Sequence, residues 1–262
     1  MTRALILAAG KGERLRPLTD DKPKCLVPLL GMSLLERQAA TLRGCGIDTI
    51  HVATGYRGDQ IEALGFETSH NARYAETNMV ESLFSARAFM SGSTEDLIIG
   101  YGDIVYAPRN LSALLASNAD IALMVDRNWR AYWDARMDNP LDDAETMLID
   151  PSGHVTELGK KPENYDQIQA QYTGLIKVRG DRVAAVIEFY DALDRDKTYD
   201  DRDFYNMYMT SFLQLLIDAN WPVEAVRVDN GWLEVDTVED LKLYESMAAA
   251  GELVRFYDAR PA

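Results

Sequence analysis

Cysteine and histidine are both scarce in this chain. Its 262 residues include only 2 Cys and 3 His. Cys25 and Cys45 have neither the number of a disulfide framework nor the spacing of a zinc site, and the histidines occur singly. The sequence therefore predicts no zinc centre and no Ser-His-Asp triad.

Long apolar runs are also absent. The first apolar run covers only about six residues, which is too short for the core of a signal peptide or for a membrane span. No other stretch approaches the roughly 20 apolar residues that a spanning helix needs. We therefore expect a cytoplasmic protein with no membrane partner.

Basic residues are in deficit. Lys and Arg number 27 against 42 Asp and Glu, so the formal net charge is -15. Nucleic acids and anionic membranes require a basic face, and we expect neither as a partner. A small polyanion bound in one focused pocket remains compatible with this composition. The hydrophobic content of 47% is that of an ordinary globular protein.

Apolar runs alternate with amphipathic segments through the first half of the chain. We expect strands at 4–7, 49–53, 97–103 and 121–125, and helices at 34–42, 60–64, 78–90 and 108–117. The runs are continuous, which is typical of buried parallel strands. We predict one α/β domain over residues 1–262, with a doubly wound, mostly parallel Rossmann-like sheet and helices on both faces.

The pattern changes after Val125. Aromatic residues lie among charges at 127–138, and 146–159 reads as a hairpin around the turn Pro151-Ser152-Gly153. Later elements are expected as strands at 172–178, 223–228 and 232–235 and helices at 182–193 and 204–219, followed by a helix capped by Thr237 and Asp240. We expect residues from about 127 to 180 to form a small lid.

The loop at residues 7–24, after the first strand, concentrates positive charge in this acidic chain. It contains five basic residues and three acidic ones, and the basic ones are Lys11, Arg14, Arg16, Lys22 and Lys24. Glycines at 10 and 12 allow the backbone to approach a ligand closely and to offer amide donors. Arg14 and Lys24 can converge on phosphate oxygens. The loop therefore predicts an anion site.

Two common phosphate-binding motifs do not fit this loop. A dinucleotide fingerprint requires a third glycine where Leu15 stands, and a P-loop requires Ser or Thr after Gly-Lys. The run Ala8-Ala9-Gly10-x-Gly12-x-Arg14-Leu15-x-Pro17-Leu18-Thr19, followed by Lys22-Pro23-Lys24, instead closely resembles the nucleotide-binding signature of the sugar-phosphate nucleotidyltransferase superfamily.

Two further motifs resemble the same superfamily. Gly102-Asp103 at a strand end resembles its first metal carboxylate, and Trp232-Leu233-Glu234-Val235-Asp236 resembles its second. The resemblance implies transfer of a nucleoside monophosphate from a nucleoside triphosphate to a phosphorylated small molecule, with release of pyrophosphate and with Mg²⁺ as cofactor. Two hard carboxylates without nearby His or Cys suit magnesium.

The resemblance also implies residue roles. Lys24 and Arg14 would be catalytic and would neutralise phosphate charge, while Asp103 and Asp236 would bind Mg²⁺. An acceptor phosphate, with a second pKa of about 6, needs no general base to become a nucleophile. The nucleotide would contact the backbone and side chains of Leu7, Ala8, Ala9, Gly10, Lys11, Gly12 and Gly102.

A shorter pattern indicates the branch of the superfamily. Asn71-x-x-Tyr74-x-x-Thr77-Asn78 with Ser82 and Leu83 resembles the cytidylyltransferases that act on phosphocholine and related phosphorylated amines or phosphonates. Met79 stands where that pattern has a second asparagine. The resemblance implies CTP as substrate, with Tyr74, Asn78 and Ser82 facing the nucleotide. Taken without it, this polar helix face is more often solvent-exposed.

The acceptor would lie beneath the second half of the chain. Lys160 replaces the glutamate of the Glu-Lys-Pro motif of sugar-nucleotide members, which suggests an anionic group there. An aromatic wall could bind a cationic head group, with Glu145 or Asp134 as counter-charge. Its candidate members are Trp129, Tyr132, Trp133, Tyr172 and Trp232, and Glu234 is a further acceptor candidate. Alternatively, these aromatic residues form the lid core.

We therefore predict a Mg²⁺-dependent cytidylyltransferase that joins CMP from CTP to a small phosphorylated acceptor such as phosphocholine, 2-aminoethylphosphonate or a phosphorylated amide. Two different functions are also compatible with the sequence. One is a sugar 1-phosphate nucleotidyltransferase that uses UTP or dTTP, and the second is a non-catalytic nucleotide-sensing domain.

Overall fold

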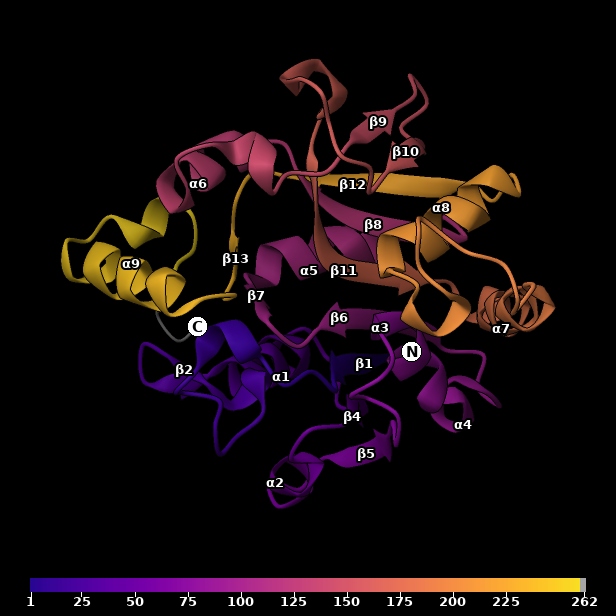
Figure 1. Ribbon diagram of the computed structural model, residues 1–262, viewed down its shortest axis with the longest axis horizontal. Coiled ribbons are helices and arrows are strands. Elements are labelled where there is room, and N and C mark those ends of the chain that lie inside the picture. Colours follow the sequence, from indigo (N-terminus) through magenta and orange to yellow (C-terminus); the bar gives the residue numbers. More distant parts are fainter. Residues whose placement is uncertain (260–262) are drawn as a thin grey trace.

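A seven-stranded sheet forms the centre of the molecule (Figure 1). The computed structural model describes residues 1–259, and the strand order is β12-β8-β11-β6-β1-β4-β5. The strands are β1 (Thr2–Ala8), β4 (Ile50–Thr54), β5 (Glu67–His70), β6 (Asp96–Tyr101), β8 (Ile121–Asp126), β11 (Gln171–Val178) and β12 (Val223–Val228). Every neighbouring pair is parallel except the two that include β11. The predicted mostly parallel sheet is confirmed.

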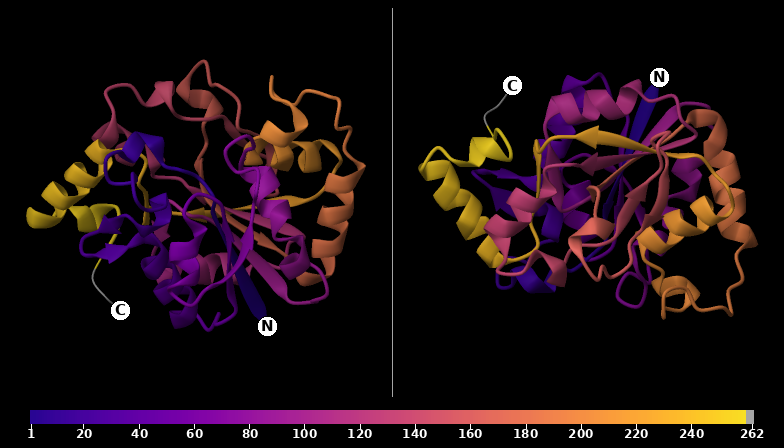
Figure 2. Two further views of the ribbon diagram at one scale, coloured as in Figure 1. Left: turned by 60° about the horizontal axis from the view of Figure 1, so that its bottom comes forward. Right: turned by 90° about the horizontal axis from the view of Figure 1, so that it is seen from above.

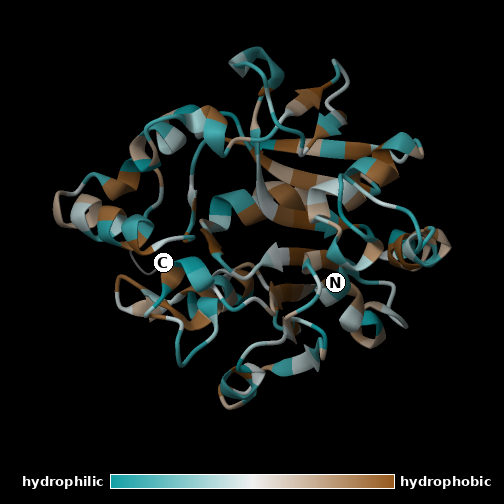
Figure 3. Ribbon diagram, in the orientation of Figure 1, coloured by the Kyte–Doolittle hydropathy of each residue, from teal (hydrophilic) through white to brown (hydrophobic). Residues whose placement is uncertain are grey.

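The sheet is buried on both faces. In β1, Ala4, Ile6 and Ala8 join one apolar cluster, whereas Leu5 and Leu7 join the other. Because alternate residues of a strand point to opposite faces, a strand buried on both sides must be apolar throughout. This explains the continuous apolar run of the first strand. Hydrophobic residues concentrate on the central strands, and the outer helices are more polar (Figure 3).

Helices cover each face, as the two further views show (Figure 2). One cluster contains residues of α1 (Leu34–Gly44), α2 (Gly58–Glu62), α5 (Pro108–Ala116), α6 (Trp129–Arg136) and α9 (Val238–Ala249). The other contains residues of α3 (Met79–Ser85), α4 (Arg87–Met90), α7 (Val183–Ala192) and α8 (Met209–Asp218). The predicted doubly wound arrangement is therefore confirmed.

Three helices begin with a side-chain cap, including the predicted cap of Thr237 and Asp240. Ser33 and Glu36 form a capping box on α1, and Thr237 and Asp240 form another on α9. The Asn78 side chain accepts a hydrogen bond from the backbone N–H of Met79 at the start of α3. These bonds satisfy N–H groups that have no partner within the helix.

Two predicted segments differ in detail. The helix expected over 78–90 is divided at Ala86 into α3 and α4. Residues 67–70, where the sequence predicts no strand, form the edge strand β5, which pairs with β4. An edge strand with no fully buried residue lacks the apolar pattern by which the other strands are recognised.

The range of about 127–180, where we expect a lid, contains elements of two kinds. Its first part includes α6 and the hairpin of β9 (Met147–Ile149) and β10 (Val155–Leu158), which confirms the hairpin; these elements are called the lid below. Residues 171–178, however, form β11 between β6 and β8 in the central sheet. Two further small sheets pair β2 (Pro28–Leu29) with β3 (Met32–Ser33) and β7 (Ile104–Tyr106) with β13 (Trp232–Glu234).

Short 3-10 helices occupy several connections. They are η1 (Glu13–Leu15), η2 (Lys24–Leu26), η3 (Pro140–Asp142), η4 (Tyr165–Gln167), η5 (Gly180–Arg182), η6 (Phe204–Asn206) and η7 (Leu253–Arg255). Within residues 1–259, no helix has the length and apolar character needed to cross a membrane.

Candidate active site

Two aspartates that are far apart in the sequence meet at the carboxyl end of the sheet. Asp103 follows β6, and Asp236 follows β13. The antiparallel pairing of β13 with β7 fixes their separation, and the backbone N–H of Val235 donates to the Asp103 carbonyl at 3.0 Å. Lys24 Nζ lies 2.7 Å from Asp103 Oδ2 and 2.6 Å from Asp236 Oδ1. The structure thus brings the three predicted residues together.

The loop over residues 7–24 holds Lys24 through a close backbone approach. Gly12 has a φ of 65°, and a Cβ at this position would lie 2.9 Å from Lys24 Cβ. The Thr19 hydroxyl donates to the Gly12 carbonyl at 2.8 Å and stabilises this turn. Glycine is therefore required at 12 both for the left-handed backbone and for the space that Lys24 occupies.

Charges around Asp236 keep it ionised. Burial alone would raise the pKa of this carboxyl, but Lys24, Arg14 and Arg136 together lower it below its ordinary value. Arg14 Nη2 is 3.0 Å and Arg136 Nη2 is 3.7 Å from an Asp236 oxygen. Burial likewise opposes the charge of Lys24, yet Asp103 and Asp236 raise the pKa of its ammonium. Both partners therefore stay charged at neutral pH.

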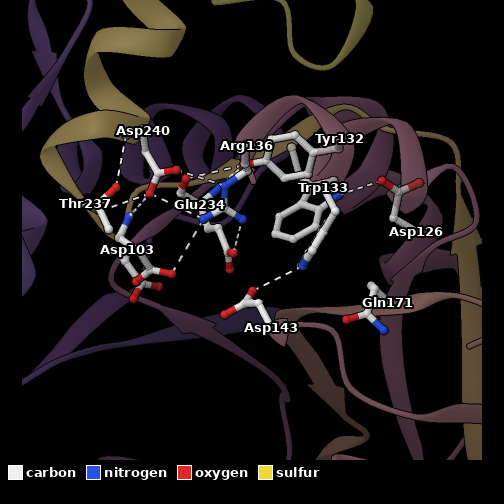
Figure 4. A network of polar contacts seen from close by, with 12 residues as sticks. Asp103, Asp126, Tyr132, Trp133, Arg136, Asp143, Gln171, Glu234, Thr237 and Asp240 are labelled. Atoms are coloured by element: carbon white, nitrogen blue, oxygen red, sulfur yellow. Dashed lines mark hydrogen bonds and ion pairs between the residues drawn. The ribbon is translucent and has the colours of Figure 1, made fainter. Parts of the chain in front are cut away.

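Arg136 was not predicted as a site residue. It ends α6, its side chain is only 4% exposed, and it forms ion pairs with Glu234 and Asp240. Figure 4 shows Arg136 pointing toward these two carboxylates, with Trp133 and Asp143 nearby. An arginine at a helix end reads as surface charge in the sequence, so only the fold reveals its partners.

Most of the predicted nucleotide residues line two small adjoining cavities. One, of about 110 Å³, includes Leu7, Ala9 and Gly10. It is closed by Tyr74, Asn78 and Ser82, as well as Thr77 and Met79. The other, of about 90 Å³, also contacts Ala8, Lys24, Gly102 and Asp103.

The remaining contacts explain two of these positions. A Cβ on Gly102 would lie 2.7 Å from the Leu7 carbonyl oxygen, so glycine is needed for this close approach. The buried Asn71 amide donates to the hydroxyls of Thr77 and Ser82 at 3.0 and 3.1 Å, which orients Ser82. Lys11 and Gly12 do not line either cavity. Gly12 acts instead through its contact with Lys24.

A third cavity of about 280 Å³ connects the two aspartates with the lid. Four of the predicted acceptor residues line it, namely Trp133, Glu145, Tyr172 and Glu234, together with Arg14, Asn78, Asp103 and Asp236. Further lining residues that sequence reasoning missed include Tyr101, Asp143, Gln171, Thr173, Tyr208 and Thr210. This cavity places the acceptor candidates beside the phosphate-binding candidates.

The β-bulge in β11 shapes one wall of this cavity. The register with β8 shifts between Tyr172 and Ile176. Gly174 lies within this shift with a φ of 82°, and a Cβ there would lie 2.8 Å from the Tyr101 ring. Bulges re-aim side chains at sheet edges and next to active sites. The signal in the sequence is the glycine inside the apolar run 172–178.

Glu145 has an unusual position in the cavity. Both polar atoms of the Gln171 amide bond to the Glu145 backbone, Nε2 to the carbonyl at 2.6 Å and Oε1 from the N–H at 3.2 Å. Within residues 1–259, its carboxylate has no hydrogen-bond or ion-pair partner. Burial, with a smaller effect of Asp143, raises the pKa of Glu145 to about 7. The Glu145 backbone is therefore fixed by Gln171, while the carboxylate has no protein cation to neutralise it.

Glu234 and Asp143 differ from Glu145, because each has a partner. Glu234 pairs with Arg136, although burial still raises its pKa to about 7. Asp143 Oδ2 accepts a hydrogen bond from Trp133 Nε1 at 3.1 Å (Figure 4). The Trp133 ring is thus oriented by the carboxylate next to Glu145.

Some predicted acceptor residues are not at the cavity. Trp129 is buried against Trp133 and Tyr165. Lys160, after the end of β10, is exposed and pairs with Glu157 at 2.7 Å. The structure therefore does not bring Trp129 and Lys160 together with the acceptor candidates that line the cavity.

Three further candidates for the acceptor site also lie away from the cavity. Tyr132 and Trp232 are fully buried and belong to the apolar cluster on one face of the central sheet. Asp134 is exposed and pairs with Arg130. Of the proposed aromatic wall, only Trp133 and Tyr172 reach the cavity.

Comparison with known proteins agrees with this geometry. The family profile described as "MobA-like NTP transferase domain" matches residues 4–158. The chain belongs to this family. A CTP:phosphoglutamine cytidylyltransferase of Campylobacter jejuni is 42% identical to this NTP transferase over 248 residues, which is 92% of the present chain and 98% of the relative.

Two more comparisons place this NTP transferase within its superfamily. A choline-phosphate cytidylyltransferase of Streptococcus pneumoniae is 37% identical over 95 residues, 35% of this chain and 42% of that protein. The structure of the inositol-1-phosphate CTP transferase from T. maritima superposes with a TM-score of 0.70 at 21% identity, covering 99% of this chain and 98% of that one. The predicted superfamily, branch and Rossmann-like fold are confirmed, and the protein is a nucleotidyltransferase.

Proposed function

We propose that this NTP transferase is a cytidylyltransferase that transfers CMP from CTP to the phosphoryl group of a phosphorylated amino-acid amide of the phosphoglutamine type, releasing pyrophosphate. The observation that carries the proposal is the 42% identity to a CTP:phosphoglutamine cytidylyltransferase along nearly the full length of both chains. The cavity chemistry supports it independently, as the following contacts show.

Lys24 and Arg14 are the proposed catalytic cations. The Lys24 ammonium has three donor protons, and Asp103 and Asp236 accept two hydrogen bonds from it. One proton therefore remains for a phosphate oxygen of CTP. Arg14, whose side chain is 65% exposed, is accessible to the triphosphate beside it. Donors placed where negative charge develops stabilise a phosphoryl-transfer transition state.

Asp103 and Asp236 are the proposed ligands of Mg²⁺. Members of this family generally use a divalent metal, and two carboxylate oxygens are the hard ligands that magnesium prefers. Among residues 1–259, no group of three or more His, Cys, Asp and Glu side chains is arranged to hold a metal. The donor set therefore fits an ion that takes its remaining ligands from phosphates and water. When bound, it would neutralise phosphate charge.

The reaction requires no general base. The acceptor phosphate is largely ionised above its second pKa of about 6, so one of its oxygens can attack directly. That oxygen forms a bond to the α-phosphorus of CTP, and the bond from this phosphorus to the β-bridging oxygen breaks. The electron pair leaves on pyrophosphate. The chain's residues position the two anions and reduce their repulsion.

Glu145 is the proposed anchor of the acceptor. An α-ammonium group would supply the cation that its carboxylate lacks. The adjacent Asp143 and the ring faces of Trp133 and Tyr172 line the same cavity and would favour this positive group. A sugar 1-phosphate whose sugar carries no charge offers no such cation. The unpaired carboxylate thus favours an aminated acceptor.

A pyrophosphate-release assay tests this function. It compares CTP, UTP, dTTP and ATP, each with phosphoglutamine, phosphocholine, 2-aminoethylphosphonate and glucose 1-phosphate. We expect the highest kcat/KM for CTP with phosphoglutamine. Greater turnover of UTP or dTTP with glucose 1-phosphate would contradict the proposal, and so would nucleotide binding without turnover of any acceptor.

A further inference from the structure

Helix α6 lines the acceptor cavity and also contacts Asp236, one of the two proposed metal ligands. Trp133 on α6 lines the cavity, and Arg136 follows three residues later at the end of the helix. The Arg136 guanidinium lies over the rings of Tyr132 and Trp133, with its carbon 5.1 and 5.5 Å from their centroids. These contacts fix the direction of the arginine side chain.

Arg136 binds several carboxylates at once. Its Nη1 donates to Glu234, and its Nε lies 3.0 Å from Asp240 Oδ1. Its Nη2 donates to Asp240 Oδ2 at 3.3 Å (Figure 4). The same nitrogen lies 3.7 Å from Asp236 Oδ2. With the side chain 4% exposed, water cannot replace these partners. The planar fork of arginine suits such multiple contacts.

Asp240 extends this contact to the backbone of Asp236. Asp240 Oδ2 accepts hydrogen bonds from the backbone N–H groups of Asp236 and Thr237, both at 2.9 Å. Arg136 therefore acts on Asp236 in two ways. Its charge attracts the Asp236 carboxylate, and its bond to Asp240 holds the carboxylate that fixes the Asp236 backbone.

Removal of Arg136 would leave several carboxylates close together with fewer cations. Glu234, Asp236 and Asp240 would then repel one another in a buried region, where charges are screened much less than in water. Leaving a buried charge without its partner is strongly destabilising. Rearrangement of these side chains would displace Asp236.

We propose that Arg136 is a positioning residue through which the lid helix α6 holds Asp236 in place to bind the metal–nucleotide complex. The inference rests on the proposed function, because it takes Asp236 as a metal ligand. Arg136 does not line the cavity, so it acts on the reaction through Asp236, Glu234 and Asp240.

The test measures Mn²⁺ affinity by paramagnetic titration in the presence of CTP, and separately of UTP, with no acceptor present. We expect Arg136→Met to weaken Mn²⁺ binding about 10–100-fold, which is typical for loss of a residue that orients a metal ligand. Arg136→Lys keeps the charge but not the fork, and its affinity should lie between those of the wild type and Arg136→Met. A purely structural role would reduce the folded fraction and leave the affinity of the folded protein unchanged.

Lys177→Met is the matched control. Lys177 is also 4% exposed and pairs with Asp96 at 2.9 Å, but Asp96 begins β6, at the end of the strand away from Asp103. This variant should lose stability and keep its Mn²⁺ affinity within about twofold. Circular dichroism and Trp fluorescence check the folding of every variant.

Unchanged Mn²⁺ affinity in folded Arg136→Met overturns the inference. If that variant does not fold, an affinity of Arg136→Lys equal to that of the wild type overturns it. A weakened affinity with both nucleotides supports it even if the wild-type protein does not prefer CTP. Absence of a CTP preference would instead contradict the proposed function, so the two failures are distinguishable.

Discussion

Asp236 and Glu145 line the same cavity, but their carboxylates have different surroundings. Lys24, Arg14 and Arg136 surround Asp236 and lower its pKa. Glu145 forms no ion pair within residues 1–259, and burial raises its pKa to about 7. The nucleotide side of the cavity thus carries its own positive charge, whereas the acceptor side lacks it. We infer that the acceptor supplies the missing cation.

The largest expected effect comes from removing the cation between the two aspartates. Lys24→Met should lower kcat by about 10²–10³-fold, the range observed when one transition-state donor is lost. Lys22→Met, two residues earlier in the same loop, is the control and should retain nearly full activity. Pyrophosphate release at saturating substrates is the measurement. A near-normal kcat in folded Lys24→Met would remove the proposed catalytic role.

The nucleotide side was largely predictable from the sequence. Lys24 belongs to a long motif, and Asp103 and Asp236 each follow a recognisable strand, so the order of these elements places them at one sheet edge. Arg136 and Asp143 lie in irregularly patterned segments, and their proximity to the site depends on how the lid packs. Local sequence carries no signal for such contacts.

On the acceptor side, too, the sequence does not show which individual residues reach the cavity. Trp129 and Trp133 are one helical turn apart on α6, and both are buried, yet only Trp133 lines the cavity. The apolar run 172–178 indicates a strand, but neither its antiparallel direction nor its place in the central sheet follows from its composition. A short apolar strand pattern is the same in either direction.

Glu145→Gln tests the proposed role of the unpaired carboxylate on the acceptor side of the cavity. We expect the KM for phosphoglutamine to rise about tenfold, which corresponds to about 1.4 kcal/mol of lost binding energy, because the ammonium loses its counter-charge. The KM for CTP should change less than about twofold. Steady-state kinetics with each substrate varied in turn provide the measurement, and equal increases in both KM values would contradict the assigned role.

Glu145→Gln weakens acceptor binding, but we expect it to make the folded protein more stable than the wild type at high pH. A carboxyl with a pKa near 7 when folded and about 4.3 when unfolded binds more protons in the folded state between these values. Its contribution to stability is therefore lost as the pH rises from about 4.3 to about 7, and is absent above that range. The Tm of Glu145→Gln relative to the wild type should be higher at pH 8 than at pH 5. Thermal unfolding at both pH values checks the sign.

The pH dependence of kcat/KM for the acceptor tests whether ionised Glu145 binds the acceptor. Ionised Glu145 binds a cation, so kcat/KM for the acceptor should rise several-fold between pH 6 and 8, with an apparent pKa near 7. The acceptor phosphate also titrates, with a pKa of about 6. Glu145→Gln should retain only that lower transition. A wild-type profile identical to that of Glu145→Gln would exclude titration of Glu145 as the cause.

The smallest effects are expected outside the cavity. Lys160→Ala should leave acceptor KM within about twofold, because the Lys160 side chain is exposed and paired with Glu157. Trp129→Phe should lower the Tm, as expected for a smaller buried ring, but leave acceptor KM nearly unchanged. In contrast, Trp133→Phe changes a residue that lines the cavity and should raise the acceptor KM. If Trp129→Phe and Trp133→Phe raise acceptor KM equally, the two tryptophans are not distinguished as the structure indicates.

A single competition experiment tests the proposed function most directly. The protein is incubated with equal concentrations of CTP, UTP and dTTP and of phosphoglutamine, phosphocholine and glucose 1-phosphate, and the nucleotide products are measured by mass spectrometry. We expect a CDP-linked glutamine as the main product. A UDP- or dTDP-linked glucose as the main product would contradict the proposed function.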